Sequence, residues 1–409
     1  MPQSAALPLI DALPPLAAIV GPEHAHPSQD AVVVSPGSVE QIAAILRFAG
    51  EHRLAVSPLG TGTKPGWGNP VAAQIRLALG RMNTLREHSW QDMTCGVEAG
   101  CAWAAMQAQL APHGQTVALD PLWPARATVG GIVAANDGGH LRLRYGGLRD
   151  LIIGMTIVLA DGTIARTGGK VVKNVAGYDL HKLMTGSFGT LGVIAAVNFR
   201  LHPLETHSRT WTAEAPDPSH LEAPLRALLG SRIAPSGLQI RIGPQFCSLD
   251  VRVAATPACL DDHAEQIKAL LAPTPVRESG HDLWSARQQL FDASGAVVLK
   301  ATMLPSQICS VLAALRESST AHHAAFTAVA QCNGLVDIAI HASPEASIAL
   351  IELLRRSCSS VTALQLPSHL RSRVDVWGCD STALPLMREI KRRFDPARIL
   401  NPGRFVGNI

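Results

Sequence analysis

The sequence predicts a mixed α+β protein that is divided into two or three structural units. The chain has 409 residues, of which 47% are apolar and 16% are charged, so it can bury a large core. Glycine and proline are frequent, with 34 and 28 residues, which is typical of a chain with many tight turns. Segments with the periodicity of strands and helices alternate along the chain, which excludes a disordered protein.

A βαβ unit is expected in the N-terminal part. Residues 31–34 predict a strand, and Ser38 with Gln41 three residues later is a capping-box pattern that begins a helix. Residues 54–57 predict the next strand. The segment 58–68 that follows contains four glycines and two prolines, so it forms a turn rather than a regular element.

The next part, up to about residue 203, has the pattern of a sheet with short connections. Asp161-Gly162 is a hairpin signal between two of its strands. The predicted strands are 75–79, 94–98, 151–159 and 193–201, and the predicted helices are 101–111 and 178–184.

Beyond residue 205, strands and helices alternate in an order that predicts a ferredoxin-like sheet. The expected strands are 238–242, 248–253, 297–303 and 335–340, and the expected helices are 218–229, 258–271, 305–317 and 344–356. A basic helix at about 383–394 precedes the C-terminal residues.

Charge and cysteine spacing exclude several classes of protein. A formal charge of +3 and the lack of a long basic run give no reason to expect nucleic acid as a partner. The eight cysteines are scattered without a CxxC pair, which predicts reduced core thiols in a cytoplasmic protein. The longest apolar run, 151–160, is about half as long as a membrane helix. Pro8, Pro14 and Pro15 interrupt the apolar N-terminus.

The turn at 58–68 is the first segment that indicates chemistry. Closely spaced glycines let backbone N–H groups converge into a nest for phosphate oxygens. Thr61, Thr63 and Lys64 add hydroxyl and ammonium donors. The spacing fits neither GxGxxG nor a P-loop, and an ordinary surface turn is the alternative.

A second glycine-rich segment lies at 120–139. Gly130-Gly131 opens a stretch of small apolar residues against which a planar ligand can lie, and Asn136 and Gly138 then turn the chain. The start of a buried helix is the alternative interpretation.

A third stretch combines 168–183 with 186–193. In this order and spacing, the three segments resemble the FAD domain of the vanillyl-alcohol-oxidase/PCMH flavoprotein superfamily, over roughly residues 30–205. The resemblance implies FAD as the cofactor, with its pyrophosphate on 58–64. The FAD contacts expected on this basis are Pro58, Leu59, Gly60, Thr61, Gly62, Thr63, Lys64, Pro121, Gly130, Gly131, Asn136, Gly138, Gly186, Ser187, Gly189, Thr190, Leu191, Val193 and Asn401.

The motif 173–180, together with the terminal segment 395–403, is similar to the FAD-binding E subunits of bacterial glycolate oxidases. This narrower resemblance implies oxidation of glycolate to glyoxylate by hydride transfer to flavin. It also implies two partners, a second FAD-containing subunit and an iron–sulfur subunit. A cytoplasmic location without a transmembrane segment is expected, and peripheral attachment to the inner membrane through partners is left open.

The expected domain division follows from the same resemblance. Residues 1–80 and 81–205 are the two α+β sub-domains of a PCMH-type FAD-binding domain. Residues 206–380 are a smaller ferredoxin-like cap domain, and 381–409 form a C-terminal segment whose helix returns to the FAD domain.

Two departures from the family pattern matter. Members that link FAD covalently use a His or Cys in defined places, whereas 58–68 contains neither and no comparable Cys lies in 121–139, so the FAD is expected to be non-covalent. Related 2-hydroxy-acid dehydrogenases carry a His-x-Gly-Asp-Gly-Asn-type segment for metal and substrate. This chain has sixteen histidines but no such segment, which predicts no metal site and leaves open a role beside a catalytic sister subunit.

The sequence identifies no catalytic residue, and the candidates are Tyr178, Asp179 and Arg142. A phenol or carboxylate beside a flavin can orient a hydroxyl group, and a guanidinium can bind a carboxylate. The alternatives are that Tyr178 packs in the core, that Asp179 caps a helix, and that the arginine pairs with Asp150 or Asp161.

Two further functions remain open on the sequence alone. One is a free-standing FAD-dependent oxidoreductase of another small 2-hydroxy acid. The other is a non-catalytic subunit that keeps the flavin fold. A nicotinamide-dependent reductase is disfavoured, because no second dinucleotide fingerprint occurs.

Overall fold

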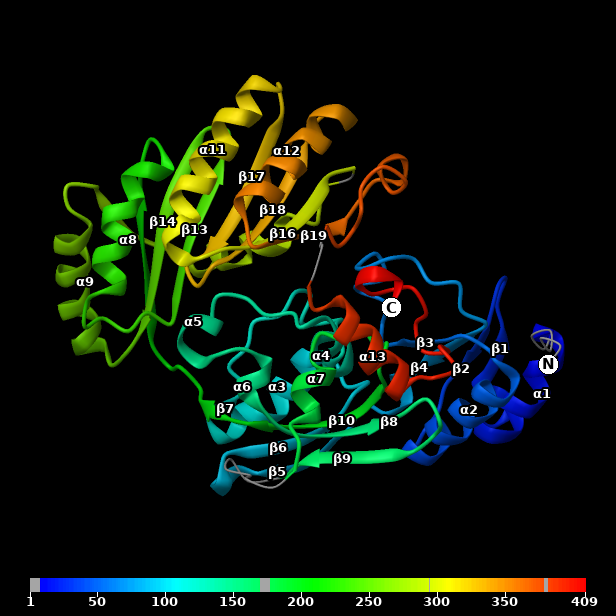
Figure 1. Ribbon diagram of the computed structural model, residues 1–409. Coiled ribbons are helices and arrows are strands. Elements are labelled where there is room, and N and C mark those ends of the chain that lie inside the picture. Colours follow the sequence, from blue (N-terminus) through cyan, green and yellow to red (C-terminus); the bar gives the residue numbers. More distant parts are fainter. Residues whose placement is uncertain (1–7, 170–176, 294, 379–381) are drawn as a thin grey trace. The chain divides into compact units, whose positions relative to one another are not determined.

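The computed structural model describes residues 8–169, 177–293, 295–378 and 382–409. The chain forms two compact units, whose elements are labelled in Figure 1. The first unit consists of residues 1–137, 147–204 and 380–409, and the second consists of 138–146 and 205–379. The first unit is therefore interrupted twice by residues of the second.

The first sheet of the first unit has the strand order β1-β2-β4-β3. Strands β2, β4 and β3 are parallel, and β1 pairs with β2 in the antiparallel sense. The Ser38 hydroxyl accepts from Gln41 N at 3.2 Å and begins the second helix as predicted. The elements are α1 (Leu9–Val20), β1 (Ala25–Pro27), β2 (Val32–Val34), α2 (Val39–His52), β3 (Val56–Leu59) and β4 (Ile75–Ala78).

The N-terminal helix α1 corrects the expectation that prolines interrupt this segment. It runs from Leu9 to Val20 with two consecutive prolines in its interior. Each interior proline removes a backbone hydrogen bond, at a cost of about 3 kcal/mol. Ala12, Leu16 and Val20 repeat every four residues and are buried in the core, and this burial offsets the cost.

The second sheet of the first unit has the order β5-β6-β10-β8-β9, and all its pairs are antiparallel. The β8–β9 pair turns at the predicted Asp161-Gly162 hairpin. Buried residues of both sheets form one hydrophobic core. The strands of the second sheet are β5 (Leu85–Ser89), β6 (Thr94–Glu98), β8 (Ile152–Val158), β9 (Ile164–Gly168) and β10 (Val193–Arg200). The short strands β7 (Gln115–Thr116) and β11 (His202–Pro203) form a separate antiparallel pair. The helices are α3 (Trp103–Leu110), α4 (Val129–Ala135), α5 (Arg142–Tyr145), α6 (Leu148–Leu151) and α7 (Leu180–Met184), of which α5 belongs to the second unit.

The second unit is built on one antiparallel sheet in the order β15-β12-β14-β13-β17-β18-β16-β19. It contains two consecutive β-α-β-β-α-β repeats, each with the ferredoxin-like strand order, joined where β13 pairs with β17. The predicted ferredoxin-like sheet is thus present twice. The strands are β12 (Ser208–Glu214), β13 (Gly237–Gly243), β14 (Phe246–Ala254), β15 (Val276–Ser279), β16 (Val297–Thr302), β17 (Ala325–Gln331), β18 (Leu335–His341) and β19 (Ser360–Gln365). The helices are α8 (Glu222–Leu229), α9 (Pro257–Leu271), α10 (Ala286–Gln289), α11 (Ile308–Ala321) and α12 (Pro344–Ser357).

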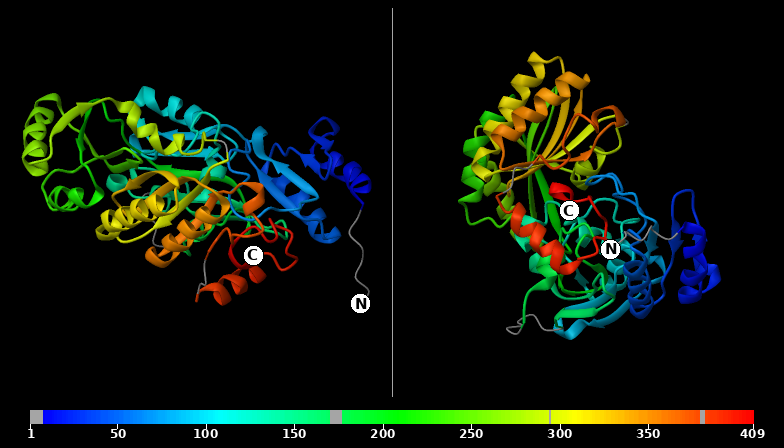
Figure 2. Two further views of the ribbon diagram at one scale, coloured as in Figure 1. Left: turned by 90° about the horizontal axis from the view of Figure 1, so that it is seen from above. Right: turned by 45° about the vertical axis from the view of Figure 1, so that its right-hand side comes forward.

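The two faces of this eight-stranded sheet differ in chemistry. Alternate residues of each strand pack with α8, α9, α11 and α12 in an apolar core, and Figure 2 shows the helices along one face. The opposite face carries buried polar residues such as Gln239, Asp250 and Asp337. The segment around α10 packs on it, where Trp284 Nε1 donates to Thr210 Oγ1 at 3.0 Å.

The C-terminal helix α13 (Leu384–Phe394) is followed by residues that return to the first unit, as expected from the sequence. Leu400 forms a parallel bridge with Val56 of β3, and Asn401 N donates to Val56 O at 2.9 Å. The buried Lys391 ammonium donates to Thr190 O at 2.7 Å and to Leu400 O at 2.8 Å. These bonds join the last described residues to segments about 200 and 340 positions earlier.

Candidate functional site

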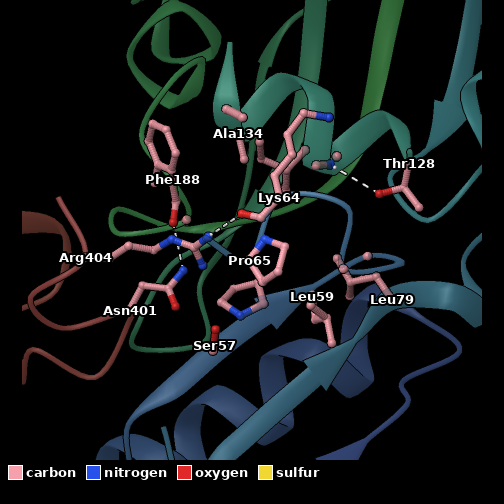
Figure 3. Close-up of a pocket in the computed structure, with 18 of the residues that line it drawn as sticks. Ser57, Leu59, Lys64, Pro65, Leu79, Thr128, Ala134, Phe188, Asn401 and Arg404 are labelled. Carbon is pink, nitrogen blue, oxygen red and sulfur yellow. Dashed lines mark hydrogen bonds between the residues drawn. The ribbon is translucent and has the colours of Figure 1, made fainter. Parts of the chain in front are cut away.

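A cavity of about 540 Å³ lies in the first unit (Figure 3). Most of its lining comes from four separate parts of the chain: the turn after β3, the segment that contains α4, the turn before β10, and the residues after α13. Arg76, Leu79 and Ala99 also contribute. The volume is in the range of small-molecule sites, and the lining is mostly backbone and small side chains.

The turn after β3 presents its backbone to the cavity. Residues 60–63 all line it, and none of their amide N–H groups donates a hydrogen bond to another residue that the structure describes. Gly62 has a φ of +71°, which glycine adopts without strain. The Thr61 hydroxyl is used within the protein, since it donates to Arg126 O at 2.6 Å. The amide groups of this turn therefore form a cradle for an anion.

The α4 wall approaches the turn so closely that it requires glycine. A Cβ atom on Gly60 would overlap Thr128 Oγ1, and one on Gly130 would lie 2.8 Å from the Ala99 Cβ. Thr128 is the N-cap of α4, and its hydroxyl accepts from Gly131 N at 3.3 Å. Backbone on both sides of the cavity is thus open to a bound molecule.

The C-terminal residues hold the third wall in place. Asn401 Nδ2 donates to Phe188 O at 2.7 Å, as Figure 3 shows. Phe188 and Gly189 both have positive φ angles, of 53° and 68°. Because Lys391 also binds Thr190 O, the whole turn 187–190 depends on residues near the C-terminus for its position.

Arg404 brings positive charge to the cavity. One guanidinium nitrogen donates to Lys64 O at 3.2 Å, and the group lies 5.9 Å from the centre of the Phe188 ring. Burial lowers the pKa of Arg404 from its usual value, but an arginine remains charged at neutral pH. The cavity therefore suits an anionic ligand.

The Lys64 side chain is buried beside the cavity rather than exposed in it. Its Nζ atom lies 3.1 Å from Asp137 Oδ2, and the two side chains are 8% and 0% exposed. The ammonium group also lies over the rings of Trp67 and Trp123, at 5.5 and 5.3 Å from their centres. Trp123 thus contacts a buried charge.

The structure brings together part of the predicted cofactor set. The predicted residues that line the cavity are Pro58, Leu59, Gly60, Thr61, Gly62, Thr63, Lys64, Gly130, Gly131, Gly189 and Asn401. The predicted residues outside the lining are Pro121, Asn136, Gly138, Gly186, Ser187, Thr190, Leu191 and Val193. Asn136 ends α4 with a φ of 48°, and Gly138 belongs to the second unit.

Several lining residues were not predicted. Ala99, Thr128, Phe188 and Arg404 contribute to the cavity from four places in the sequence. Arg404 lies directly after the Asn401-Pro-Gly motif, and Thr128 is a helix-capping residue just before Gly130, so both had a local signal. Phe188 and Ala99 have no such signal, because only the tertiary fold brings them to the cavity.

The three catalytic candidates do not form a cluster. Tyr178 is 90% exposed, so the alternative that it packs in the core is wrong. Asp179 occupies the N-cap position of α7 without a capping bond, and its carboxylate bonds to Lys182 Nζ at 2.5 Å, which lowers the pKa of Asp179. Arg142 is half-buried in α5 of the second unit. Residues 173–176 of the motif 173–180 lie outside the described residues.

The alternative that Arg142 pairs with Asp150 or Asp161 is not seen among the ion pairs of the described residues. Asp150 accepts from Gly147 N at 2.9 Å, and Asp161 accepts from Thr163. Arg144 of the same segment donates to Ala234 O at 2.9 Å within the second unit.

The residues that the structure describes contain no group of three or more His, Cys, Asp or Glu side chains that could hold a metal ion. No helix among them is both long enough and apolar enough to cross a membrane. Burial raises the pKa of the thiols of Cys95 and Cys247 to about 12, which keeps them protonated and unreactive.

Known families match both ends of the first unit. Residues 31–168 match the model of the FAD binding domain, and residues 379–405 match that of the C-terminal domain of FAD-linked oxidases. The chain is 31% identical over 226 residues to glycolate oxidase subunit GlcD of Bacillus subtilis, over 55% of this chain and 48% of that one. It is 37% identical over 195 residues to a D-lactate dehydrogenase of Archaeoglobus fulgidus, over 47% and 42% of the two chains. Each match thus spans less than half of the relative's own length.

A solved structure agrees over the full chain. The 4-ethylphenol oxidase from Gulosibacter chungangensis has a TM-score of 0.76 at 15% identity, and the likeness covers 98% of both chains. The cavity fits FAD in its chemistry, because free amide groups and Arg404 suit a pyrophosphate and glycine walls suit a flat ring system. The chain therefore has the PCMH-type FAD-binding fold, with an FAD-binding domain at residues 31–168 and FAD as its cofactor.

Proposed function

We propose that this chain is an FAD-dependent oxidoreductase whose cavity holds the pyrophosphate of FAD on the amide groups of residues 60–63. The observation that carries the proposal is that these four amides line the cavity and have no acceptor among the described residues. Amide N–H groups that converge on a cavity and have no acceptor within the protein are available to phosphate oxygens. Arg404 adds the charge that an anion requires.

The remaining walls would hold the rest of the cofactor. Gly130 and Gly131 allow a ring system to lie against α4, while Gly189 and Asn401 border the opposite side. Bound FAD supplies a hydride acceptor, and the chain's own residues bind it, orient it and exclude water. The lining residues include neither His nor Cys, which supports non-covalent binding.

The substrate proposed is glycolate, which would be oxidised to glyoxylate, and the chain would act as the FAD-binding subunit of a glycolate oxidase complex. The similarity to GlcD and the terminal motif at 395–403 support this assignment. The partners would be a second FAD-containing subunit and an iron–sulfur subunit that accepts the electrons. The complex would be cytoplasmic, with peripheral attachment to the inner membrane through these partners. The candidates are Arg142 for binding the substrate carboxylate, and Tyr178 and Asp179, both exposed, for orienting its hydroxyl group.

A second candidate is a subunit that carries electrons while a sister subunit oxidises glycolate. It is favoured by the lack, among the described residues, of a cluster of metal-ligating side chains such as the related dehydrogenases are expected to use. A third is a free-standing oxidoreductase of another small 2-hydroxy acid, favoured by the similarity to a D-lactate dehydrogenase.

The test is to purify the chain alone and record its visible spectrum. Acid precipitation should release yellow FAD into the supernatant, and a colourless folded chain would contradict the proposal. Anaerobic addition of glycolate should bleach the flavin if this chain is itself the catalyst. Bleaching only after the partner subunits are added would assign the electron-carrying role. Bleaching by D-lactate but not by glycolate would instead support a free-standing oxidoreductase of another 2-hydroxy acid.

A further inference from the structure

We propose that the buried ion pair between Lys64 and Asp137 positions the cofactor-binding turn, and that the Lys64 ammonium group is not itself a phosphate ligand. The pair would hold residues 60–63 in the conformation in which their amide groups bind the pyrophosphate. This inference rests on the pyrophosphate site proposed above.

The pair is buried at both ends. The Nζ to Oδ2 distance is 3.1 Å, and Asp137 Oδ2 also accepts from Leu122 N at 2.9 Å. Separating two charges that are only 8% and 0% exposed would leave each without its partner in a site that excludes water, which is strongly unfavourable. The ammonium group is therefore committed to the carboxylate.

Two indole rings hold the ammonium group in the same direction. Its Nζ atom lies 5.3 Å from the Trp123 ring centre and 5.5 Å from that of Trp67. Figure 3 shows this end of Lys64 directed away from Arg404 and Asn401. The two aromatic faces fix the orientation of the Lys64 side chain, and the carboxylate balances its charge.

The turn is thus attached to three other segments. The Lys64 side chain binds Asp137, its carbonyl accepts from Arg404, and the Thr61 hydroxyl donates to Arg126 O. Of these attachments, only the Lys64–Asp137 pair joins two buried opposite charges. Because all three use groups other than the amides of 60–63, they hold the turn while leaving those amides available.

The two possible roles of Lys64 predict opposite effects of neutralising Asp137. If Lys64 acts by holding the turn, Asp137→Asn loosens the turn and weakens FAD binding. If the ammonium group binds phosphate directly, the same change releases it from its carboxylate and removes a negative charge near the phosphates. FAD binding would then be unchanged or tighter.

The experiment is a fluorescence titration of flavin-free protein with FAD. Because a preorganised turn lowers the cost of binding, we expect Asp137→Asn to raise the Kd for FAD by about tenfold or more. Glu265→Gln is the matched control, since it breaks an exposed pair with Lys268 at 2.8 Å and should leave the Kd unchanged. An unchanged or lower Kd in Asp137→Asn would overturn the inference.

Folding is checked by circular dichroism and thermal unfolding of each flavin-free variant. If Asp137→Asn does not fold, Trp123→Leu decides, because it removes one ring from Lys64 and leaves both charges in place. A raised Kd again supports the positioning role, and an unchanged or lower Kd overturns it. Failure of the wild-type chain to bind FAD would instead contradict the proposed function.

Discussion

Both units bury ion pairs, but they place them in different kinds of structure. In the first unit, the Lys64–Asp137 pair joins two segments that lie far apart in the sequence. Lys391 pairs with Asp395 one helical turn later, and its ammonium group also donates to the distant Thr190 O. In the second unit, Asp337 lies on a strand with neighbours on both sides and pairs with Arg287 at 2.7 Å. Strand pairing already positions Asp337, whereas the turns around the cavity have no such support. A site built from loops depends on its buried pairs for geometry, and a sheet depends on them much less.

The largest expected effect tests this difference directly. Lys391→Met leaves the fully buried Asp395 without its cation, so the first unit should lose about 3–5 kcal/mol of unfolding free energy. It should also lose FAD affinity, because Lys391 holds Thr190 O next to the cavity. Urea unfolding and an FAD titration measure the two quantities.

Arg287→Met is the matched variant in the second unit. It should cost a similar amount of stability, because it leaves the buried Asp337 behind, but it should not change the Kd for FAD under conditions where both units are folded. A comparable loss of FAD affinity in this variant would break the comparison, since the position of the cavity walls would then depend on the sheet of the second unit as well.

An intermediate effect is expected from Gly60→Ala. The added methyl group would overlap Thr128 Oγ1, and moving that hydroxyl away would cost α4 its N-cap. We expect about a tenfold rise in the Kd for FAD, because both walls of the cavity shift. Gly80→Ala is the control, as a Cβ there would meet no atom within 4 Å. Equal Kd values for the two variants would show that the wall spacing is not critical.

The smallest effect concerns acid sensitivity, which we assign to the first unit. Burial lowers the pKa of His181 below its usual 6.5, so the unfolded chain takes up a proton before the folded chain does as the pH falls. Stability is therefore fully present above pH 6.5 and decreases as the pH falls from there towards the lowered pKa. His181→Gln should flatten this decrease, which thermal unfolding measured at a series of pH values above and below 6.5 would show. A decrease of the same steepness in the variant would contradict the assignment.

The same contrast explains what the sequence could predict. Strand and helix patterns were sufficient for most of the second unit, because each element packs on its neighbours in a repeated order. The duplication itself was not recognised, because the two repeats share topology rather than visible sequence. Helix α1 was missed because its two consecutive prolines locally disfavour a helix. The burial of Leu16 favours the helix, but it is visible only in the folded protein.

The glycine-rich segments of the site were predicted because their spacing is visible in the sequence. Residues that only the tertiary fold brings to the cavity were missed. The turn at 58–64 and the pair Gly130-Gly131 line the cavity as their composition indicated. Lys64 lines it too, but the partner of its side chain, Asp137, could not be inferred from a position 73 residues away. Residues such as Phe188 are brought to the cavity only by the bonds of Asn401 and Lys391.

The bridge between Val56 and Leu400 has a consequence for the order of events during synthesis. Chains emerge from the ribosome N-terminal end first, and domains generally fold as units. The residues that carry most of the cavity are made early, but Asn401 and Arg404 follow only after the entire second unit has been translated. Nascent chains that lack these last residues have an open-sided cavity. We therefore expect FAD to be captured only after both units have been synthesised, and a ribosome-bound chain stalled before residue 400 should not retain the cofactor.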